Sequence, residues 1–293
     1  MERLMEHDWG EEWRALAAER RPAPDEADWD KRSRNYPRSS TRSPYVDAFI
    51  EGLGMRPGES VLDMGCGNGA LSIPLAMDGH YVIAADFSTG MLEALKEESS
   101  QLGELPIELI HMSWEEDWSV HGIDDDCVDV AIASRSICTD DLEDSIRRLD
   151  AAARRRCAAT LPVGLSPRSD PHILSELGLP VVRGASCAYA FLILMKMGRL
   201  PEVKYIASTK PNIFSDEDDA IQAIRRMVED ALSDSGMDDL HSIYLSKADE
   251  WTVANLVPNP DAGKPDGRGG EQGKLMLDIP RRVTWAYVSW NVA

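Results

Sequence analysis

The stretch Val61-Leu62-Asp63-Met64-Gly65-Cys66-Gly67-Asn68-Gly69 decides the fold that we expect for this chain. Its first four residues are typical of a short buried strand, and three glycines at every second position predict a turn directly after it. A helical pattern follows at 70–76. A strand, a glycine-rich turn and a helix in this order let a ligand approach bare backbone, and the first N–H groups of the helix favour an anionic group.

Strands and helices continue to alternate after this turn. We expect further strands at 81–85, 107–111, 128–133, 157–163, 203–207 and 282–292, and helices at 88–100 and 142–156. Such alternation predicts a mostly parallel sheet with right-handed crossover connections. The strand at 282–292 is expected to run antiparallel at an edge of this sheet.

Composition divides the chain into four segments. Residues 1–40 are expected to form a helical lead or lid, 41–163 the ligand-binding core, 164–200 a helical cap insertion, and 201–293 the C-terminal part of the sheet with its helices. The apolar run at 189–195 supplies the cap helix, since it is too short to span a bilayer.

The charge balance excludes one class of partner. Fifty-one acidic residues against 31 basic ones give a net charge of −20, which repels DNA and other polynucleotides as well as anionic membrane surfaces. We therefore expect a small substrate, uncharged or cationic. The compact basic run at 154–156 is expected to be the solvated last turn of a helix, where cations suit the helix dipole.

Cysteine usage and hydropathy indicate the compartment. The five cysteines show no C-x-x-C spacing, so we expect reduced structural thiols and no metal site. The first 21 residues lack the apolar stretch of a signal peptide, and no run of eighteen apolar residues could cross a membrane. A cytoplasmic protein is the expectation.

Two interpretations compete for the glycine turn. Residues 65–70 loosely match the G-x-G-x-x-A fingerprint of dinucleotide-binding proteins. Against this interpretation, Asp63 occupies a strand position that is usually apolar in those proteins, and the third glycine does not follow their spacing.

The same stretch resembles the first motif, D/E-x-G-x-G-x-G, of class I S-adenosylmethionine-dependent methyltransferases. The resemblance extends to Asp86, which lies 19 residues after Gly67 and opens the second motif at 86–92, and to the fourth-strand motif at 128–134. It covers about residues 40–163 and is nearest to the small-molecule, quinone-biosynthesis-like branch. The implied fold is α/β: a Rossmann-like, doubly wound, mostly parallel seven-stranded sheet with an antiparallel edge strand.

The resemblance implies S-adenosyl-L-methionine as cofactor and a role for each motif residue. The turn formed by Gly65, Cys66, Gly67 and Gly69 would pass under the methionine part. Asp63 would favour its ammonium group, and Asp86 would accept hydrogen bonds from both ribose hydroxyls.

The remaining cofactor contacts follow from the ends of the later strands. Phe87 is expected to pack on one face of the adenine, and Trp114 to flank its edge. Ser113 stands where the family often has an acid, with Glu115 as a possible substitute. Ser134 would offer its backbone near the sulfonium, and Arg135 would lead into the substrate side.

The implied reaction is an in-line displacement that transfers a methyl group to a small-molecule acceptor. No catalytic dyad is visible, so no catalytic residue is assigned. The run at 133–136 also lacks the Asn/Asp-Pro-Pro-Tyr pattern of enzymes that methylate nucleic-acid amino groups. Candidate walls of an acceptor pocket are Tyr36, Tyr45, Tyr189 and Phe191.

Three alternatives use the same fold. One is a protein or RNA methyltransferase that works with a partner subunit. Another is a non-catalytic protein that senses the cofactor. An aminopropyl-transferring synthase would need paired acids after the fourth strand, which 134–136 lacks. The acceptor and the oligomeric state are left open by the sequence.

Overall fold

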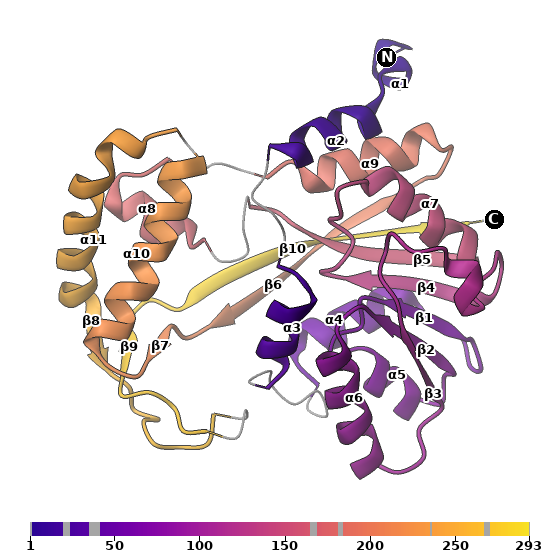
Figure 1. Cartoon of the computed structure of the whole chain (residues 1–293), viewed down its shortest axis with the longest axis horizontal. Coiled ribbons are helices and arrows are strands. Elements are labelled where there is room, and N and C mark those ends of the chain that lie inside the picture. The colour runs from indigo at the N-terminus through magenta and orange to yellow at the C-terminus, as the bar shows by residue number, and fades with distance from the viewer. Residues whose placement is uncertain are drawn as a thin grey trace. The chain divides into compact units, whose positions relative to one another are not determined.

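The computed structural model describes residues 2–19, 24–34, 42–164, 169–180, 184–234, 236–266 and 270–292, and the chain divides into two compact units (Figure 1). The core unit comprises Met1–Leu161, Ser186–Ile206 and Trp285–Ala293. The second unit comprises Pro162–Ala185 and Ala207–Thr284.

A seven-stranded sheet of order β3-β2-β1-β4-β5-β10-β6 organises the core unit. Its strands are β1 (Val61–Met64), β2 (Val82–Asp86), β3 (Ile107–His111), β4 (Val128–Ser134), β5 (Ala153–Pro162), β6 (Glu202–Lys210) and β10 (Arg281–Asn291). The pairs β1–β2, β2–β3, β1–β4 and β4–β5 are parallel, and β10 is the antiparallel strand. The carboxyl ends of the parallel strands therefore share one edge, where ligands bind in open sheets of this kind.

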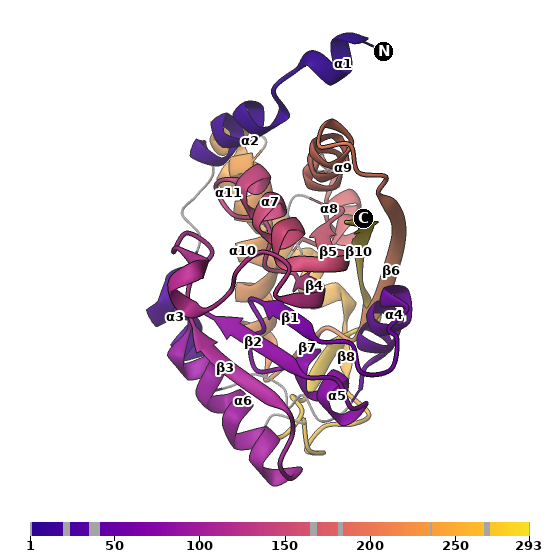
Figure 2. The ribbon, with the colours of Figure 1, turned by 90° about the vertical axis from the view of Figure 1, so that its right-hand side faces the viewer.

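Helices cover both faces of this sheet (Figure 2). One face packs against α2 (Trp9–Ala18), α7 (Leu142–Ala152) and α9 (Ser186–Lys196) in one apolar core. On the other face lie α4 (Pro44–Leu53), α5 (Ser72–Met77) and α6 (Thr89–Gln101). Successive strand residues alternate between the faces, so Leu62 and Met64 of β1 join the first core while Asp63 points toward α5.

Local signals explain where these helices begin. Ser43 caps α4 ahead of Pro44, whose fixed φ suits the first turn. Ser88 caps α6, its hydroxyl accepting from the backbone N–H of Met91. Two further lead helices are α1 (Glu2–Glu6) and α3 (Glu26–Ser33), and short 3-10 helices occupy Trp118–His121 and Asp238–Leu240.

The second unit has its own apolar core. It contains α8 (Pro171–Leu177), α10 (Glu217–Asp234), α11 (His241–Asn255) and a small sheet of β7 (Ile213–Phe214), β9 (Leu275–Leu277) and β8 (Leu256–Pro258). The core gathers residues from each of these helices, including Ile173, Leu177, Val228 and Ala248.

The predicted sheet is confirmed, with one refinement in its order. The last strand, β10, lies between β5 and β6, so the antiparallel strand is one place in from the edge. The boundaries of the two units also differ from the boundaries of the four expected segments. Within 164–200, α9 joins the core unit through Tyr189 and Ile193, whereas α8 packs in the second unit.

The basic run at 154–156 was wrongly expected to end a helix. Helix α7 stops at Ala152, and all three arginines lie in β5. Arg154 pairs with Asp129, and Arg155 makes a two-nitrogen contact with the Glu59 carboxylate. Partners distant in the sequence stabilise these cations in the strand, which a local helical pattern cannot indicate.

Candidate functional site

The glycine turn after β1 has the backbone that only glycine adopts at low cost. Gly65, Gly67 and Gly69 have φ values of +73°, +56° and +89°. A Cβ on Gly65 would lie 2.3 Å from the Ser136 side chain, and one on Gly69 would lie 2.7 Å from Leu95. A Cβ on Gly67 would meet no atom of the described residues within 4 Å. The turn is therefore packed at its two ends and open at its centre.

Asp63 presents an incompletely bonded carboxylate at this turn. The side chain is buried; Oδ2 accepts from the Ser72 hydroxyl at 2.6 Å, and the buried Oδ1 has no hydrogen-bond partner among the described residues. Burial, opposed by the Ser72 hydrogen bond and reinforced by the nearby Asp86 charge, raises the pKa of Asp63 to about 7. Such a group favours a cationic hydrogen-bond donor.

Asp86 ends β2 beside the same turn. Its Oδ2 accepts from the Gly67 N–H at 2.7 Å, and its Oδ1 accepts from the Ser88 N–H at 2.9 Å. Burial raises the pKa of Asp86, and these two backbone bonds oppose the shift. Each carboxylate oxygen keeps further acceptor capacity, so the group can bind hydroxyls while it holds the turn.

Asp30, a residue of the N-terminal lead, also lies near the end of β2. Sequence reasoning missed this residue. Oδ1 of Asp30 in α3 accepts from the Ser88 hydroxyl at 2.7 Å and from the Gly90 N–H at 2.9 Å. These bonds hold the pKa of Asp30 below its usual range. Part of the expected lead thus packs at the start of α6. A glycine in the first turn of α6, where a Cβ would lie 2.7 Å from the Ser33 hydroxyl, was the available signal.

The residues expected around an adenine lie in different environments. Phe87 is half-buried, and its carbonyl lies 2.9 Å from Nε2 of His111. Ser113 is also half-buried, and its N–H donates to Glu116, while Glu115 is exposed. Trp114 belongs to the apolar core, with its ring centroid 5.4 Å from that of Trp118, and its buried indole N–H lacks a partner among the described residues.

A second polar cluster lies at the carboxyl end of β4. The Tyr45 hydroxyl is hydrogen-bonded to Ser134 Oγ at 2.8 Å and to Thr160 Oγ1 at 2.7 Å. Burial raises the pKa of the Tyr45 phenol, so its neutral form holds α4, β4 and β5 together. Ser136 donates to the Met64 carbonyl at 2.6 Å, which connects this cluster to the glycine turn.

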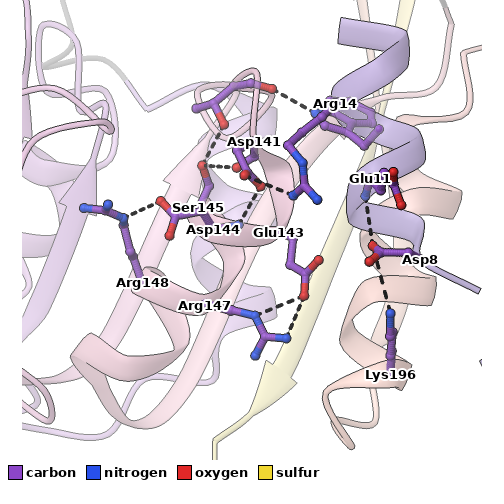
Figure 3. A network of polar contacts seen from close by, with 12 residues as sticks. Asp8, Glu11, Arg14, Asp141, Glu143, Asp144, Ser145, Arg147, Arg148 and Lys196 are labelled. Carbon is purple, nitrogen blue, oxygen red and sulfur yellow. Dashed lines mark hydrogen bonds and ion pairs between the residues drawn. The ribbon is translucent and has the colours of Figure 1, made fainter.

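The lead also holds the loop that follows β4. Trp13 of α2 is fully buried, and its indole N–H donates to the Thr139 carbonyl at 2.9 Å. Arg14 pairs with the Asp141 carboxylate at 3.1 Å. This ion pair lies next to the ion pairs of α7 (Figure 3). A Cβ on Gly10 would collide with Glu143, so α2 and α7 are in close contact. Helix α2 thus fixes both ends of the segment 139–143.

The other candidates do not gather at this edge as a group. Tyr36 lies outside the described residues. The Tyr189 hydroxyl donates to Glu12 on α2, and Phe191 is exposed. Among the described residues, no three histidine, cysteine, aspartate or glutamate side chains are placed to hold a metal ion. No helix in the described part of the chain is long and apolar enough to cross a membrane.

The residues at the β1–β2 edge fit the cofactor that the motifs imply. An ammonium group can satisfy the orphaned Oδ1 of Asp63, vicinal hydroxyls can use Asp86, and the space beside Gly67 admits a ligand against the backbone. Cys66 is buried, and burial raises the pKa of its thiol, so it contributes as a packed apolar residue of the turn.

Known proteins are similar to this region in sequence and in fold. Residues 61–156 match the sequence profile of a family described as a methyltransferase domain. An uncharacterized protein of Haemophilus influenzae is 35% identical over 150 residues, covering 50% of this chain and 52% of that protein. A demethylmenaquinone methyltransferase of Beutenbergia cavernae is 53% identical over 45 residues, covering 15% of this chain and 19% of that enzyme.

A solved structure extends the likeness of fold beyond that domain. The YcgJ protein of Bacillus subtilis aligns with a TM-score of 0.51 at 13% identity, covering 84% of this chain and 97% of that one. At this identity the alignment bears on the fold alone. The chain spans about half the length of the Haemophilus relative and about a fifth of the Beutenbergia one.

Proposed function

We propose that this chain, whose residues 61–156 match a methyltransferase-domain family, is a class I S-adenosylmethionine-dependent enzyme that transfers the methyl group of that cofactor to a small molecule. One observation carries the proposal. The buried carboxylate of Asp63, one oxygen of which has no partner among the described residues, lies beside a glycine turn whose central residue contacts none of them through its Cβ position. Such a carboxylate costs free energy unless a cationic donor pairs with it.

We infer a distinct role for each part of the β1–β2 edge. Asp63 accepts a hydrogen bond from the amino-acid ammonium of the cofactor, and Asp86 accepts from the ribose hydroxyls. The open centre of the turn at Gly67 lets the cofactor lie against the backbone. Phe87, Ser113 and Trp114 are assigned to the adenine side, and Ser134 to the sulfonium side.

The bound cofactor supplies an electrophilic methyl group on a sulfonium, which an acceptor atom attacks in line. The protein then contributes mainly distance and alignment, since the leaving group is already activated. The rigid tie between Ser136 and Met64 keeps the segment after β4 at a fixed place relative to the glycine turn. No residue is assigned as a general base.

Calorimetry with S-adenosylhomocysteine tests this proposal. The wild-type protein should bind one equivalent, and Asp86→Ala should weaken the affinity at least tenfold, because charge-assisted hydrogen bonds contribute roughly 1.5–3 kcal/mol. Asp86→Asn should lose less, since its amide oxygen can still accept. The exposed Asp125→Ala is the matched control and should bind normally. A wild-type protein that binds no S-adenosylhomocysteine would refute the proposed function.

A further inference from the structure

Arg135, the first residue after β4, has an unusual backbone conformation. Its φ is +64°, and only it and Asp126 among the described non-glycine residues have a positive φ. Non-glycine residues rarely adopt this left-handed backbone region, and such strain persists only where the surrounding structure enforces it. Here the Arg135 N–H donates to Thr160 Oγ1 at 3.0 Å, and Thr160 is in turn bonded to Tyr45. The fold therefore holds this residue in a strained conformation at the carboxyl end of β4.

Two aromatic rings lie beside the Arg135 guanidinium, which has no acidic partner among the described residues. Its Cζ lies 4.6 Å from the centroid of the Tyr45 ring and 5.9 Å from that of Trp285. Within the described residues, no carboxylate forms an ion pair with it, although the side chain is exposed. Rings stabilise a cation through their faces but accept no hydrogen bond in the guanidinium plane. The N–H donors at its edge are therefore available to another partner.

Several other arginines of the core unit do pair with acids, although Arg32 and Arg56, like Arg135, have no ion pair among the described residues. Arg155 pairs with Glu59, and Arg199 binds Asp150 through two nitrogens. Arg147 pairs with Glu143 along α7. In a chain with 20 more acidic than basic residues, carboxylates are abundant. A guanidinium that is left without one, beside the glycine turn, marks a place for an anion from outside the protein.

The position of Arg135 relates it to the site of methyl transfer. Ser136, its neighbour, would collide with a Cβ on Gly65, so this segment touches the glycine turn. The Arg135 charge also lowers the pKa of Asp63, although burial dominates that shift. The guanidinium thus lies on the same edge of the sheet as the proposed cofactor site, on the side of β4.

We propose that Arg135 binds a carboxylate of the methyl acceptor, so that the substrate is a small carboxylic acid. This inference rests on the proposed function and narrows it. The planar guanidinium fork matches a carboxylate through two parallel hydrogen bonds, and the flanking rings of Tyr45 and Trp285 fix its plane. The net charge of the chain favours an uncharged or cationic substrate, but the local charge at this end of β4 is positive.

Benzoate is a suitable probe, with benzamide as its neutral counterpart of the same shape. Saturation-transfer NMR on the full chain, with S-adenosylhomocysteine present, should detect benzoate and not benzamide. Arg135→Gln should raise the benzoate dissociation constant at least tenfold, as expected for loss of charge-assisted hydrogen bonds. Arg135→Lys should retain part of the affinity, because it keeps the charge and loses the fork. Arg154→Gln, at the opposite end of the sheet beside Asp129, is the matched control and should bind normally.

The outcomes distinguish a failure of the carboxylate site from a failure of the proposed methyltransferase function. The affinity of every variant for S-adenosylhomocysteine, measured by calorimetry, shows that its fold is intact. A protein that binds S-adenosylhomocysteine but not benzoate, or binds benzoate equally well after Arg135→Gln, refutes the carboxylate site and leaves the proposed function standing. A protein that binds benzoate but not S-adenosylhomocysteine refutes the proposed function instead.

Discussion

The carboxyl edge of the main sheet has two halves of opposite charge. At β1 and β2, Asp63 and Asp86 bring two buried carboxylates to the glycine turn, and one oxygen of Asp63 has no partner among the described residues. At β4 and β5, Arg135 lies over the Tyr45 ring among hydroxyl groups, with no acid paired to it in the described structure. A cationic ligand could therefore pair with the carboxylates of the first half, and an anionic ligand with the guanidinium of the second.

This difference shows that net charge and local charge answer separate questions. A net charge of −20 bears on encounters with polynucleotides and surfaces, because those partners sample the whole field of the protein. A bound small molecule experiences the groups within a few ångströms. The half at β1 and β2 suits a cationic ligand, and the half at β4 suits an anionic one, so both can lie side by side on one edge.

The largest expected effect separates structural from binding glycines in the first half. Gly65→Ala should lower the free energy of unfolding by about 3 kcal/mol, because its Cβ would overlap Ser136 in a left-handed backbone conformation. Gly67→Ala should cost about 1 kcal/mol, since it meets only the backbone strain. Denaturant unfolding measures both values.

The same pair of variants tests where the ligand lies. Gly67→Ala should weaken the binding of S-adenosylhomocysteine far more than its small stability loss suggests, because its methyl group would project into the open centre of the turn. If Gly67→Ala binds as well as the wild-type protein, that space is not the cofactor site.

The next effect concerns the pH dependence of the unpaired carboxylate. Since the folded-state pKa of Asp63 is raised to about 7, its contribution to stability is full below the unfolded pKa near 4 and is lost as pH rises through about 7. Between pH 5.5 and pH 8, the wild-type protein without ligand should lose about 2 kcal/mol relative to Asp63→Asn. Paired denaturant titrations at the two pH values measure this difference.

Asp63→Asn is an informative reference because its amide oxygen can still accept from Ser72. Asp86 is present in both proteins, so the comparison isolates what depends on the Asp63 carboxyl group. Equal pH dependence of the two proteins would mean that Asp63 is already ionised at pH 5.5, and the charge difference between the two halves would then be larger.

The smallest effect concerns the hydroxyl cluster of the second half. Tyr45→Phe removes the hydrogen bonds to Ser134 and Thr160 and should cost about 1 kcal/mol of unfolding free energy. The ring that lies under Arg135 is retained, so benzoate binding should stay within about threefold of wild type. A tenfold loss would instead assign the phenol itself to the anion site. Thermal unfolding and the benzoate titration provide the two measurements.

Much of the first half could be predicted because its signals are local. Asp86 contacts the Gly67 N–H across 19 residues, within one strand–helix–strand unit of the chain. Asp30 could not be found in this way, since its contact with Ser88 spans 58 residues and depends on how α3 packs. The arginines of β5 could not be placed from local signals either. Their local sequence is compatible with a continuation of α7, but acids distant in the sequence stabilise them in the strand.

By itself, the sequence determined the parallel sheet, the glycine turn and the two carboxylates that flank it. Strand periodicity, positive φ at glycine and short chain separation are properties of neighbouring residues, so they can be read from the chain. Only the tertiary structure decided that Tyr45 meets Thr160 across 115 residues, and that Trp285 from the last strand lies beside Arg135. Those contacts depend on the order of strands in the sheet, and they decide where the Arg135 charge lies.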